Sequence, residues 1–366
     1  MTLDIGIIGC GVIADYHLRA LAEQPECRVT ACADVNSDSA QRCAAAFHVP
    51  RILADGHALL QLQDLDLVVI CTPPKWHAEL LLQALQLRKH VLVEKPLAMD
   101  LQQAQSLVTA AAKTDRIVGV ALMHRYLPVY RAVHDFIQAG VLGTVRRVRL
   151  SLGRSMIGDS RFTTPQSDPR SWLVNRTIAG GGMLMSSSIH FFSVVSYLLG
   201  NRAALTVAGR VRQLHPIAFP GIEDDIDLVV RWDNNIEFTY RESWVADLPY
   251  RGQIDGDEGQ LVLSAEGFTN LSLETECRNS NPHPYETLDW TRPVSNEQLQ
   301  ALIPQPSLFS GLWADLVKSI RQKSRVPRLP GLEHARNMQS IVTAACRTEV
   351  TRQLECVDWF PEKTVT

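Results

Sequence analysis

Apolar positions in the first third of the chain follow two alternating spacings. Short continuous apolar runs, typical of strands buried on both faces, occupy residues 3–8, 28–33, 67–71, 91–94 and 117–121. Between these runs, apolar residues recur with a helical period, which predicts helices over residues 12–24, 38–47, 77–86 and 101–113. Strands that alternate with helices form right-handed crossovers. The pattern therefore predicts an α/β domain with a doubly wound parallel sheet over residues 1–121.

The pattern changes after residue 121. A helix over 128–140 and a strand over 145–152 lead into a polar stretch, 154–176, that we expect to be a loop, and then into an apolar helix over 180–199. Strand-like segments follow without intervening helices at residues 204–211, 226–232, 236–244 and 260–263, with a hairpin turn at residues 233–235. Helices over 308–322 and 332–353 close the chain. We therefore expect residues 122–366 to form a second domain on an antiparallel or mixed sheet.

Composition and charge add exclusions. The chain has 366 residues, and 36 Lys and Arg against 39 Asp and Glu give a formal charge of −3, which argues against a nucleic-acid or anionic-membrane partner. No stretch reaches the about 18 uncharged apolar residues that a membrane helix needs. Asp4 stands where a signal peptide would be basic. We expect a cytoplasmic protein that binds neither nucleic acid nor membrane.

The cysteines indicate no metal site and no disulfide scaffold. The chain contains no Cys-x-x-Cys pair, and a chain of this length has no need of disulfides to hold its fold. We expect reduced, mostly buried thiols at all eight positions: Cys10, Cys27, Cys32, Cys43, Cys71, Cys277, Cys346 and Cys356.

The first candidate for chemistry is the glycine-rich turn of residues 9–14, which follows a strand and opens a helix. Gly9 permits the tight turn, Gly11 lets the backbone approach a pyrophosphate, and the amides of Val12 and Ile13 lie at the positive end of the helix dipole. Asp34 ends the second strand, where an acid hydrogen-bonds the adenosine ribose and repels a 2′-phosphate. The turn therefore predicts NAD as cofactor, in preference to NADP.

Two more segments follow strands whose carboxyl ends should face the cofactor. Thr72, Pro73, Pro74 and His77 come after the strand 67–71. Glu94 and Lys95 end the strand 91–94, where the lysine ammonium can contact the nicotinamide ribose or a substrate oxygen. We expect all six residues at the cofactor site.

Taken together, these segments resemble the Gfo/Idh/MocA family, the glucose–fructose oxidoreductase and inositol dehydrogenase group. The resemblance covers nearly the whole chain in the right order. It rests on these residues and stretches: 9–14 with His17, Asp34, 72–74 with His77, 90–98, 125–128, 140–145, Trp172, 180–182 and His190.

The resemblance implies an N-terminal Rossmann domain and a C-terminal α/β domain with an open, mainly antiparallel sheet. It implies oxidation or reduction of a sugar, cyclitol or polyol carbinol with a nicotinamide cofactor, and dimers or tetramers built through the sheet. Lys95 and His190 match the family's catalytic pair, and the bond before Pro96 is often cis in the family. By the same resemblance we expect substrate contacts from Arg125, Trp172, Ser186 and His190.

The chain departs from the family pattern at Ser186, where many members have an aspartate one turn before the histidine. The spacing i, i+4 would put Ser186 and His190 on one helix face, so the hydroxyl could still orient the ring. Three alternatives follow: His190 acts as a neutral base, Lys95 takes the proton, or the chemistry is lost and the protein is a nucleotide-sensing regulator on the same fold. A reductase with little need of a side-chain base is a further alternative.

Two smaller features complete the picture. Arg88 stands where the family usually has a glycine suited to left-handed backbone geometry. Residues 151–176 hold four arginines, which suit an acidic sugar or a nucleotide-sugar, or else simply a solvated or interface loop. The arginines are Arg154, Arg161, Arg170 and Arg176.

Overall fold

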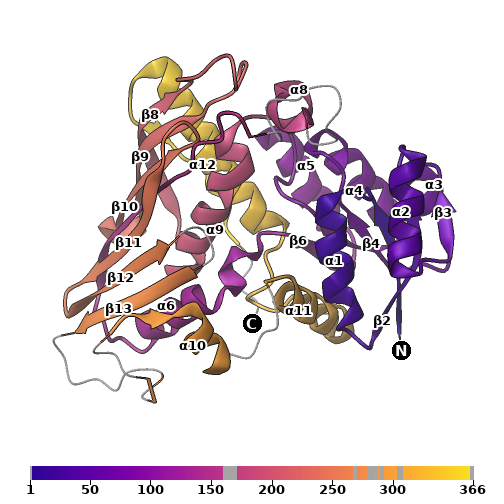
Figure 1. The fold of residues 1–366 in the computed structure, drawn as a ribbon, viewed down its shortest axis with the longest axis horizontal. Coiled ribbons are helices and arrows are strands. Elements are labelled where there is room, and N and C mark those ends of the chain that lie inside the picture. The colour runs from indigo at the N-terminus through magenta and orange to yellow at the C-terminus, as the bar shows by residue number, and fades with distance from the viewer. Residues whose placement is uncertain are drawn as a thin grey trace.

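The computed structural model describes residues 2–159, 171–266, 270–277, 285, 287–288, 292–302 and 308–362. Figure 1 shows the two sheets side by side, with helices α6, α9 and α12 between the larger sheet and the N-terminal half. These three helices span Pro128–Gln138, Ile189–Leu198 and Leu332–Thr351.

The N-terminal sheet is parallel and doubly wound, as predicted. Among the described residues its six strands run in the order β3-β2-β1-β4-β5-β6. The strands are β1 (Leu3–Ile8), β2 (Cys27–Ala33), β3 (Arg51–Leu53), β4 (Leu67–Ile70), β5 (His90–Val93) and β6 (Val118–Val120). Its helices are α1 (Val12–Ala22), α2 (Ser37–Phe47), α3 (Gly56–Leu60), α4 (His77–Gln86) and α5 (Leu101–Ala111). The short elements β3 and α3 had no clear apolar period and were not predicted.

The C-terminal sheet is mixed and mainly antiparallel. Among the described residues nine strands run in the order β14-β13-β12-β11-β7-β10-β9-β8-β15, and only β7 and β10 pair in parallel. The strands are β7 (Val145–Gly153), β8 (Ala204–Arg212), β9 (Asp225–Trp232), β10 (Glu237–Ser243), β11 (Leu248–Gly256), β12 (Gly259–Glu266), β13 (Asn270–Cys277), β14 (Val294–Ser295) and β15 (Glu355–Cys356). The remaining helices are α8 (Arg176–Ala179), α10 (Asn296–Leu302) and α11 (Leu308–Gln322). The sheet class was predicted, whereas β11, β13, β14, β15 and α10 were not.

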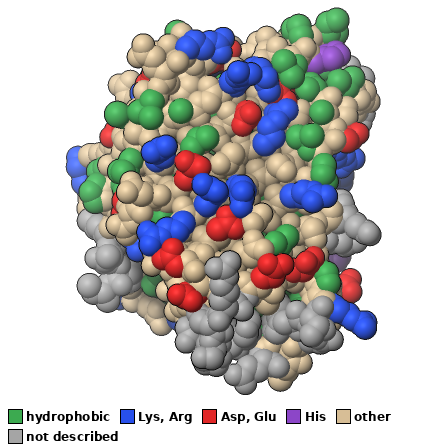
Figure 2. Space-filling model, turned by 90° about the vertical axis from the view of Figure 1, so that its left-hand side faces the viewer, with side chains coloured by type: hydrophobic (Ala, Val, Ile, Leu, Met, Phe, Trp, Pro, Cys, Tyr) green, Lys and Arg blue, Asp and Glu red, His purple; other side chains and the backbone are tan. Residues whose placement is uncertain are grey.

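The outer face of this sheet is charged. Figure 2 shows basic and acidic side chains interleaved across it. Cross-strand ion pairs account for much of the pattern, including Arg149 with Asp255 at 2.5 Å and Arg241 with Asp225 at 2.6 Å. In β9, inward residues such as Leu228 and Val230 alternate with exposed ones, so only one face is apolar.

The predicted helix over 180–199 is confirmed from Met183 onward but not over its three glycines. Helix α8 ends before Gly180, whose φ is +85°, a π-helical turn covers Leu184–Ser188, and the regular helix α9 continues from Ile189. The glycines allow a close approach, since a Cβ on Gly182 would lie 2.4 Å from the Glu223 carbonyl oxygen. By length and composition the stretch Arg176–Leu198 could cross a membrane, but 78% of the 18-residue apolar window within it is buried inside the protein, as expected of a core helix.

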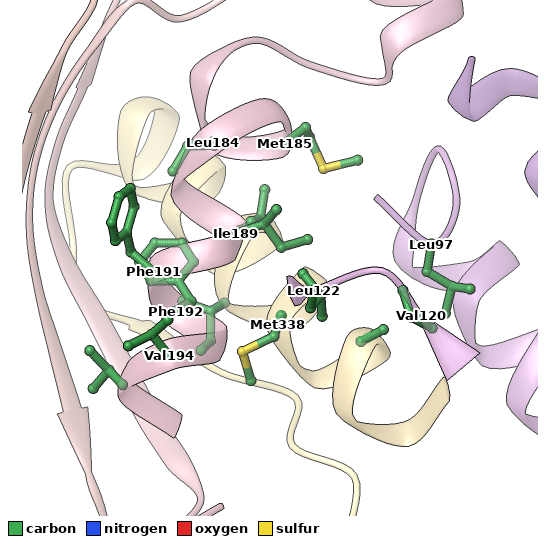
Figure 3. Close-up of a cluster of buried hydrophobic side chains, with 14 of the residues drawn as sticks. Leu97, Val120, Leu122, Leu184, Met185, Ile189, Phe191, Phe192, Val194 and Met338 are labelled. Atoms are coloured by element: carbon green, nitrogen blue, oxygen red, sulfur yellow. The ribbon is translucent and has the colours of Figure 1, made fainter. Parts of the chain in front are cut away.

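One apolar core joins the two halves at this helix. Figure 3 shows Leu97, Val120 and Leu122 from the N-terminal half facing Ile189 and Met338 from α9 and α12. Leu97 lies two residues after Lys95, and Ile189 directly precedes His190. The shared core therefore fixes the two predicted catalytic residues relative to each other.

Candidate active site

The glycine-rich turn packs tightly on one side and is open on the other. Gly9 has φ of +91°, and a Cβ there would lie 2.7 Å from the backbone carbon and oxygen of Cys71. This contact brings the β1–α1 turn against the loop after β4. A Cβ on Gly11, by contrast, would meet nothing within 4 Å. Gly11 thus leaves open space above the start of α1.

The start of α1 also differs from those of three neighbouring helices. Helices α2, α3 and α5 are capped by the side chains of Asn36, Asp55 and Asp100, each accepting a backbone N–H. Helix α1 begins at Gly11 without a side-chain cap. Its first amides are therefore open to a phosphate, and phosphate binding by Val12 and Ile13 stays a prediction. These residues fit the pyrophosphate of a dinucleotide.

Asp34 lies beside this turn. One carboxylate oxygen accepts the Cys10 N–H at 2.7 Å, and the other accepts the Asn36 N–H at 2.8 Å. Each oxygen keeps a lone pair for a ribose hydroxyl. Val35, directly after it, is an apolar side chain that is 90% exposed. Arg42, from α2, donates to the Cys10 carbonyl at 2.6 Å; sequence reasoning missed this contact because it spans two elements.

Thr72 presents an unpartnered polar atom. Its Oγ1 is buried and has no hydrogen-bond partner in the structure. A buried hydroxyl in that state is available to a ligand or a water. Pro73 and Pro74 continue the rim, and Pro74 begins a short 3₁₀ turn that leads into α4.

His77 joins two loops rather than facing the cofactor directly. It is fully buried, with Nε2 2.7 Å from the Thr72 carbonyl oxygen and Nδ1 2.8 Å from that of Pro96. Burial lowers the pKa of His77, although both carbonyls favour the protonated ring. His77 therefore holds the Thr72 loop against the Lys95 loop, and the direct cofactor contact expected of it stays a prediction.

Glu94 is held in place by the buried side chain of His17. Trp313 Nε1, which can only donate, lies 3.2 Å from His17 Nδ1, so His17 carries its proton on Nε2 and donates it to Glu94 Oε1 at 3.0 Å. The other Glu94 oxygen accepts the Lys95 N–H at 3.1 Å. A helix from the C-terminal end of the chain, α11, thus supports the residue beside Lys95 through a buried histidine.

Lys95 reaches across to the C-terminal half. Its Nζ donates to the Ser186 carbonyl oxygen at 2.6 Å, and the Lys95–Pro96 bond is cis, as the family resemblance implied. Burial lowers the pKa of Lys95, and the neighbouring Glu94 carboxylate partly opposes this. The amine therefore lies at the junction of the two halves.

His190 lies at the start of α9, and its ring stacks on that of His124. The ring centroids are 4.1 Å apart, and His190 Nδ1 is buried without a partner. Burial, then His124 and then Lys95, lower the pKa of His190 well below its ordinary value. Burial, then Lys95, lower the pKa of His124 to about 4. Both rings are thus neutral at physiological pH, and sequence reasoning missed His124, which directly precedes the matched Arg125.

The hypothesis that the Ser186 hydroxyl orients His190 is not supported. No hydrogen bond joins the two side chains in the described part of the chain. The π-helical turn over Leu184–Ser188 breaks the i, i+4 geometry that the hypothesis required. Ser186 contributes its backbone carbonyl, which binds Lys95.

Two buried carboxylates hold this π-helical turn from the sheet side. Glu223 Oε1 accepts the backbone N–H groups of Gly182 and Leu184 at 2.9 and 3.1 Å. Glu242 accepts the hydroxyl protons of Ser187 and Ser188. Burial raises the pKa of both carboxyls. These two acids therefore support the turn, and they do not take the place of the aspartate that many family members have at position 186.

Arg125 is buried between α9 and α12. It is 1% exposed, and its Nη2 donates to Ser193 Oγ at 2.9 Å and to His334 Nε2 at 2.5 Å. His334 in turn contacts Glu362 at 3.0 Å. The guanidinium therefore ties α9 to α12, while its Nε has no hydrogen-bond partner, and the expected substrate contact stays a prediction.

The arginine-rich stretch is only partly described. Arg161 and Arg170 lie outside the described residues. Arg154 and Arg176 are exposed, and Arg176 donates to the Gly221 carbonyl at 3.2 Å. Trp172 is half-buried in a 3₁₀ turn, Ser171–Val174, and its substrate contact stays a prediction.

Comparisons with known proteins agree with this geometry. A model of an oxidoreductase family with an NAD-binding Rossmann fold matches residues 3–122, and a GFO/IDH/MocA C-terminal domain model matches residues 130–262. A curated dTDP-3,4-didehydro-2,6-dideoxy-alpha-D-glucose 3-reductase of Actinomadura kijaniata is 32% identical over 248 residues, 67% of each chain. Inositol 2-dehydrogenase of Acidothermus cellulolyticus is 26% identical over 348 residues, 89% of this chain and 95% of that one. The solved structure of levoglucosan dehydrogenase in complex with NADH has a TM-score of 0.83 at 21% identity, covering 98% of this chain and 100% of that chain.

Proposed function

We propose, for a chain that belongs to the GFO/IDH/MocA family of NAD-binding oxidoreductases, that Lys95 and His190 act at a carbinol or ketone carbon of a sugar, cyclitol or related polyol. As a member of that family the protein is a nicotinamide-dependent oxidoreductase. The observation that carries the site is the bond from Lys95 Nζ to the Ser186 carbonyl, 2.6 Å long. It brings the end of a Rossmann strand to the turn that leads into His190.

His190 serves as the base in the direction of oxidation. Its neutral ring can accept the carbinol proton, and the unpartnered Nδ1 shows that one ring nitrogen is not engaged by the protein. The lowered pKa keeps the ring unprotonated at physiological pH. Lys95 donates a hydrogen bond to the substrate oxygen and stabilises negative charge that develops there. In the reverse direction His190 returns the proton.

The cofactor site uses the N-terminal half. A bound nicotinamide would supply the acceptor for the hydride of the carbinol carbon. The first amides of α1 would hold the pyrophosphate, Asp34 would bind the adenosine ribose, and Thr72 would offer a hydroxyl on the nicotinamide side. The carboxylate of Asp34 favours NAD over NADP, because it repels a 2′-phosphate.

We infer the substrate class from the relatives. The matched relatives are named for an inositol, a deoxysugar nucleotide and an anhydrosugar, all of which present adjacent oxygens on a ring. The arginines of residues 154–176 would favour an acidic or nucleotide-linked member of this class.

A spectrophotometric NAD-reduction screen over polyols, sugar acids and nucleotide-sugars tests the function. We expect turnover on at least one compound, and a loss of about 10²–10⁴-fold in kcat in both His190→Ala and Lys95→Met. His57→Ala, a matched histidine exposed on α3, should keep wild-type rates. Full turnover in His190→Ala would refute the assignment. Tight NADH binding, measured by nicotinamide fluorescence, without turnover on any compound would favour the nucleotide-sensing alternative.

We also propose that the protein is cytoplasmic and forms a homodimer or homotetramer through the outer face of the large sheet. That face carries interleaved charges of both signs, which a second copy can match by symmetry. Light scattering on the purified protein tests this, and a monomer at micromolar concentration would contradict it.

A further inference from the structure

Three cysteine thiols that are far apart in sequence meet beneath the glycine-rich turn. Cys10 lies in the β1–α1 turn, Cys32 in β2 and Cys43 in α2. Their Sγ atoms all lie within 4.8 Å of one another, and each residue is fully buried. The sequence showed no metal-binding spacing because the fold, not a local motif, builds this group.

The geometry suits a single ion. At a metal–sulfur length of about 2.3 Å, three sulfurs around one ion are separated by about 4 Å, so small inward movements suffice. The ligands are soft sulfurs, and the described residues add no fourth His, Cys, Asp or Glu to the group. Structural zinc is almost always four-coordinate, whereas thiolates select monovalent copper.

We propose that Cys10, Cys32 and Cys43 form a binding site for one thiophilic metal ion, monovalent copper, held by three sulfur ligands. The site is separate from the carbinol chemistry, and the inference does not depend on the proposed function.

Two of the thiols donate hydrogen bonds to backbone carbonyls. Cys10 Sγ donates to the Ala33 carbonyl at 3.6 Å, and Cys32 Sγ donates to the Ala40 carbonyl at 3.8 Å. Metal binding displaces these thiol protons.

The site lies directly below the cofactor turn. The Cys10 N–H donates to Asp34 at 2.7 Å, and the Cys10 carbonyl accepts from Arg42 at 2.6 Å. Gly11, next to Cys10 in the chain, and Arg42, next to Cys43, are both exposed. An ion on the three sulfurs would fix the position of Cys10. If ion binding changes the affinity for NAD, NAD binding must change the affinity for the ion by the same factor.

The test is an anaerobic titration of the full-length protein with monovalent copper against the chelator bicinchoninate. We expect the wild-type protein to take one copper ion per chain from the chelator, and Cys32→Ser and Cys43→Ser to bind it at least about tenfold more weakly. Cys27→Ser, half-buried, and Cys356→Ser, exposed, are matched controls that should bind as the wild type does. X-ray absorption of the wild-type complex should show three sulfurs at about 2.3 Å.

Three results would overturn the proposal: no copper retained by the wild-type protein, fewer than three sulfurs in the absorption spectrum, or unchanged binding in both serine variants. Because the spectrum is taken on the wild-type protein, a variant that fails to fold does not remove the test. NAD-dependent turnover of the metal-free protein is measured in parallel, so failure of the copper site is distinguishable from failure of the proposed function.

Discussion

The imidazole rings of His124 and His190 stack face to face, with centroids 4.1 Å apart and planes inclined by 12°. Nδ1 of each ring is buried without a hydrogen-bond partner. Burial, then the His124 and Lys95 charges, lower the pKa of His190, and burial, then the Lys95 charge, lower the pKa of His124. Both histidines therefore stay neutral at physiological pH, which is the state a base requires.

His124→Phe tests whether this stack tunes the base. Phenylalanine keeps a flat ring but cannot become positive, so the pKa of His190 should rise in this variant. A base with a higher pKa becomes protonated, and so inactive, at a higher pH as the solution is acidified. The acidic limb of the kcat/KM profile should therefore move to higher pH. Activity on the alkaline plateau should stay within about tenfold of wild type. A profile that does not move, in a folded variant, would contradict the tuning role.

Asp34→Ala tests the cofactor preference. Losing the hydrogen bonds to the ribose hydroxyls should raise the KM for NAD by about 10- to 100-fold, with a smaller change in kcat. The preference for NAD over NADP should shrink, because no carboxylate then repels the 2′-phosphate. Asp38→Ala, an exposed acid in the first turn of α2, is the control and should leave both constants unchanged. Retention of the full preference for NAD would contradict the role of Asp34.

The N-terminal site was predictable because its rules are local. Gly9, Asp34 and Lys95 each follow an apolar run, and in a parallel sheet the residues after such runs share one edge. The prediction needed no knowledge of which strands are neighbours. The left-handed position of Arg88, with φ of 57°, was instead predicted from the family resemblance, because the family usually has a glycine there.

The C-terminal part of the site was not predictable because it depends on strand register and on a local irregularity. Glu223 and Glu242 support the Gly182–Ser188 region from other elements, and no period in the sequence links them to it. The apolar composition of residues 180–199 predicted a helix, which the structure has from Met183, but it could not predict the close approach of Gly182 to Glu223 or the π-helical turn. Cys10, Cys32 and Cys43 meet for the same non-local reason.

Glu242→Gln tests the buried carboxyl beneath the turn. Burial raises the pKa of Glu242 in the folded protein above its ordinary value of 4.5. The folded state then binds more protons than the unfolded state between these two pKa values, so the free energy of unfolding falls as pH rises through this window. Glutamine does not titrate, so the free energy of unfolding, measured with urea at several pH values, should depend less steeply on pH in the variant. Glu274→Gln, an exposed acid on β13, should keep the wild-type slope, and an equal slope in both variants would contradict the prediction.

Arg88→Gly tests the one departure that concerns stability alone. A non-glycine residue at φ of 57° costs about 1 kcal/mol, and the 3.7 Å ion pair with Asp115 is exposed and compensates little. The glycine variant should gain about 0.5–1 kcal/mol in the free energy of unfolding, measured with urea. Arg88→Ala keeps the Cβ and removes the same charge, so it should gain nothing. A gain in both variants would assign the effect to the charge instead.

Ser186→Asp restores an acid at the position where the family resemblance led us to expect one. Ser186 already binds Lys95 through its carbonyl, so a carboxylate on the same residue brings negative charge toward Lys95 and His190. An opposite charge nearby raises the pKa of both groups. We therefore expect the acidic limb of the rate profile to move to higher pH by about 1 pH unit or more. At pH 8 we expect kcat to be up to about tenfold higher. Ser187→Asp is the control, since its carboxylate would face the buried Glu242 and should cost about 2–4 kcal/mol in unfolding free energy. If Ser186→Asp folds normally and changes neither the profile nor kcat, position 186 does not act on the proton transfer, and the neutral histidine alone performs it.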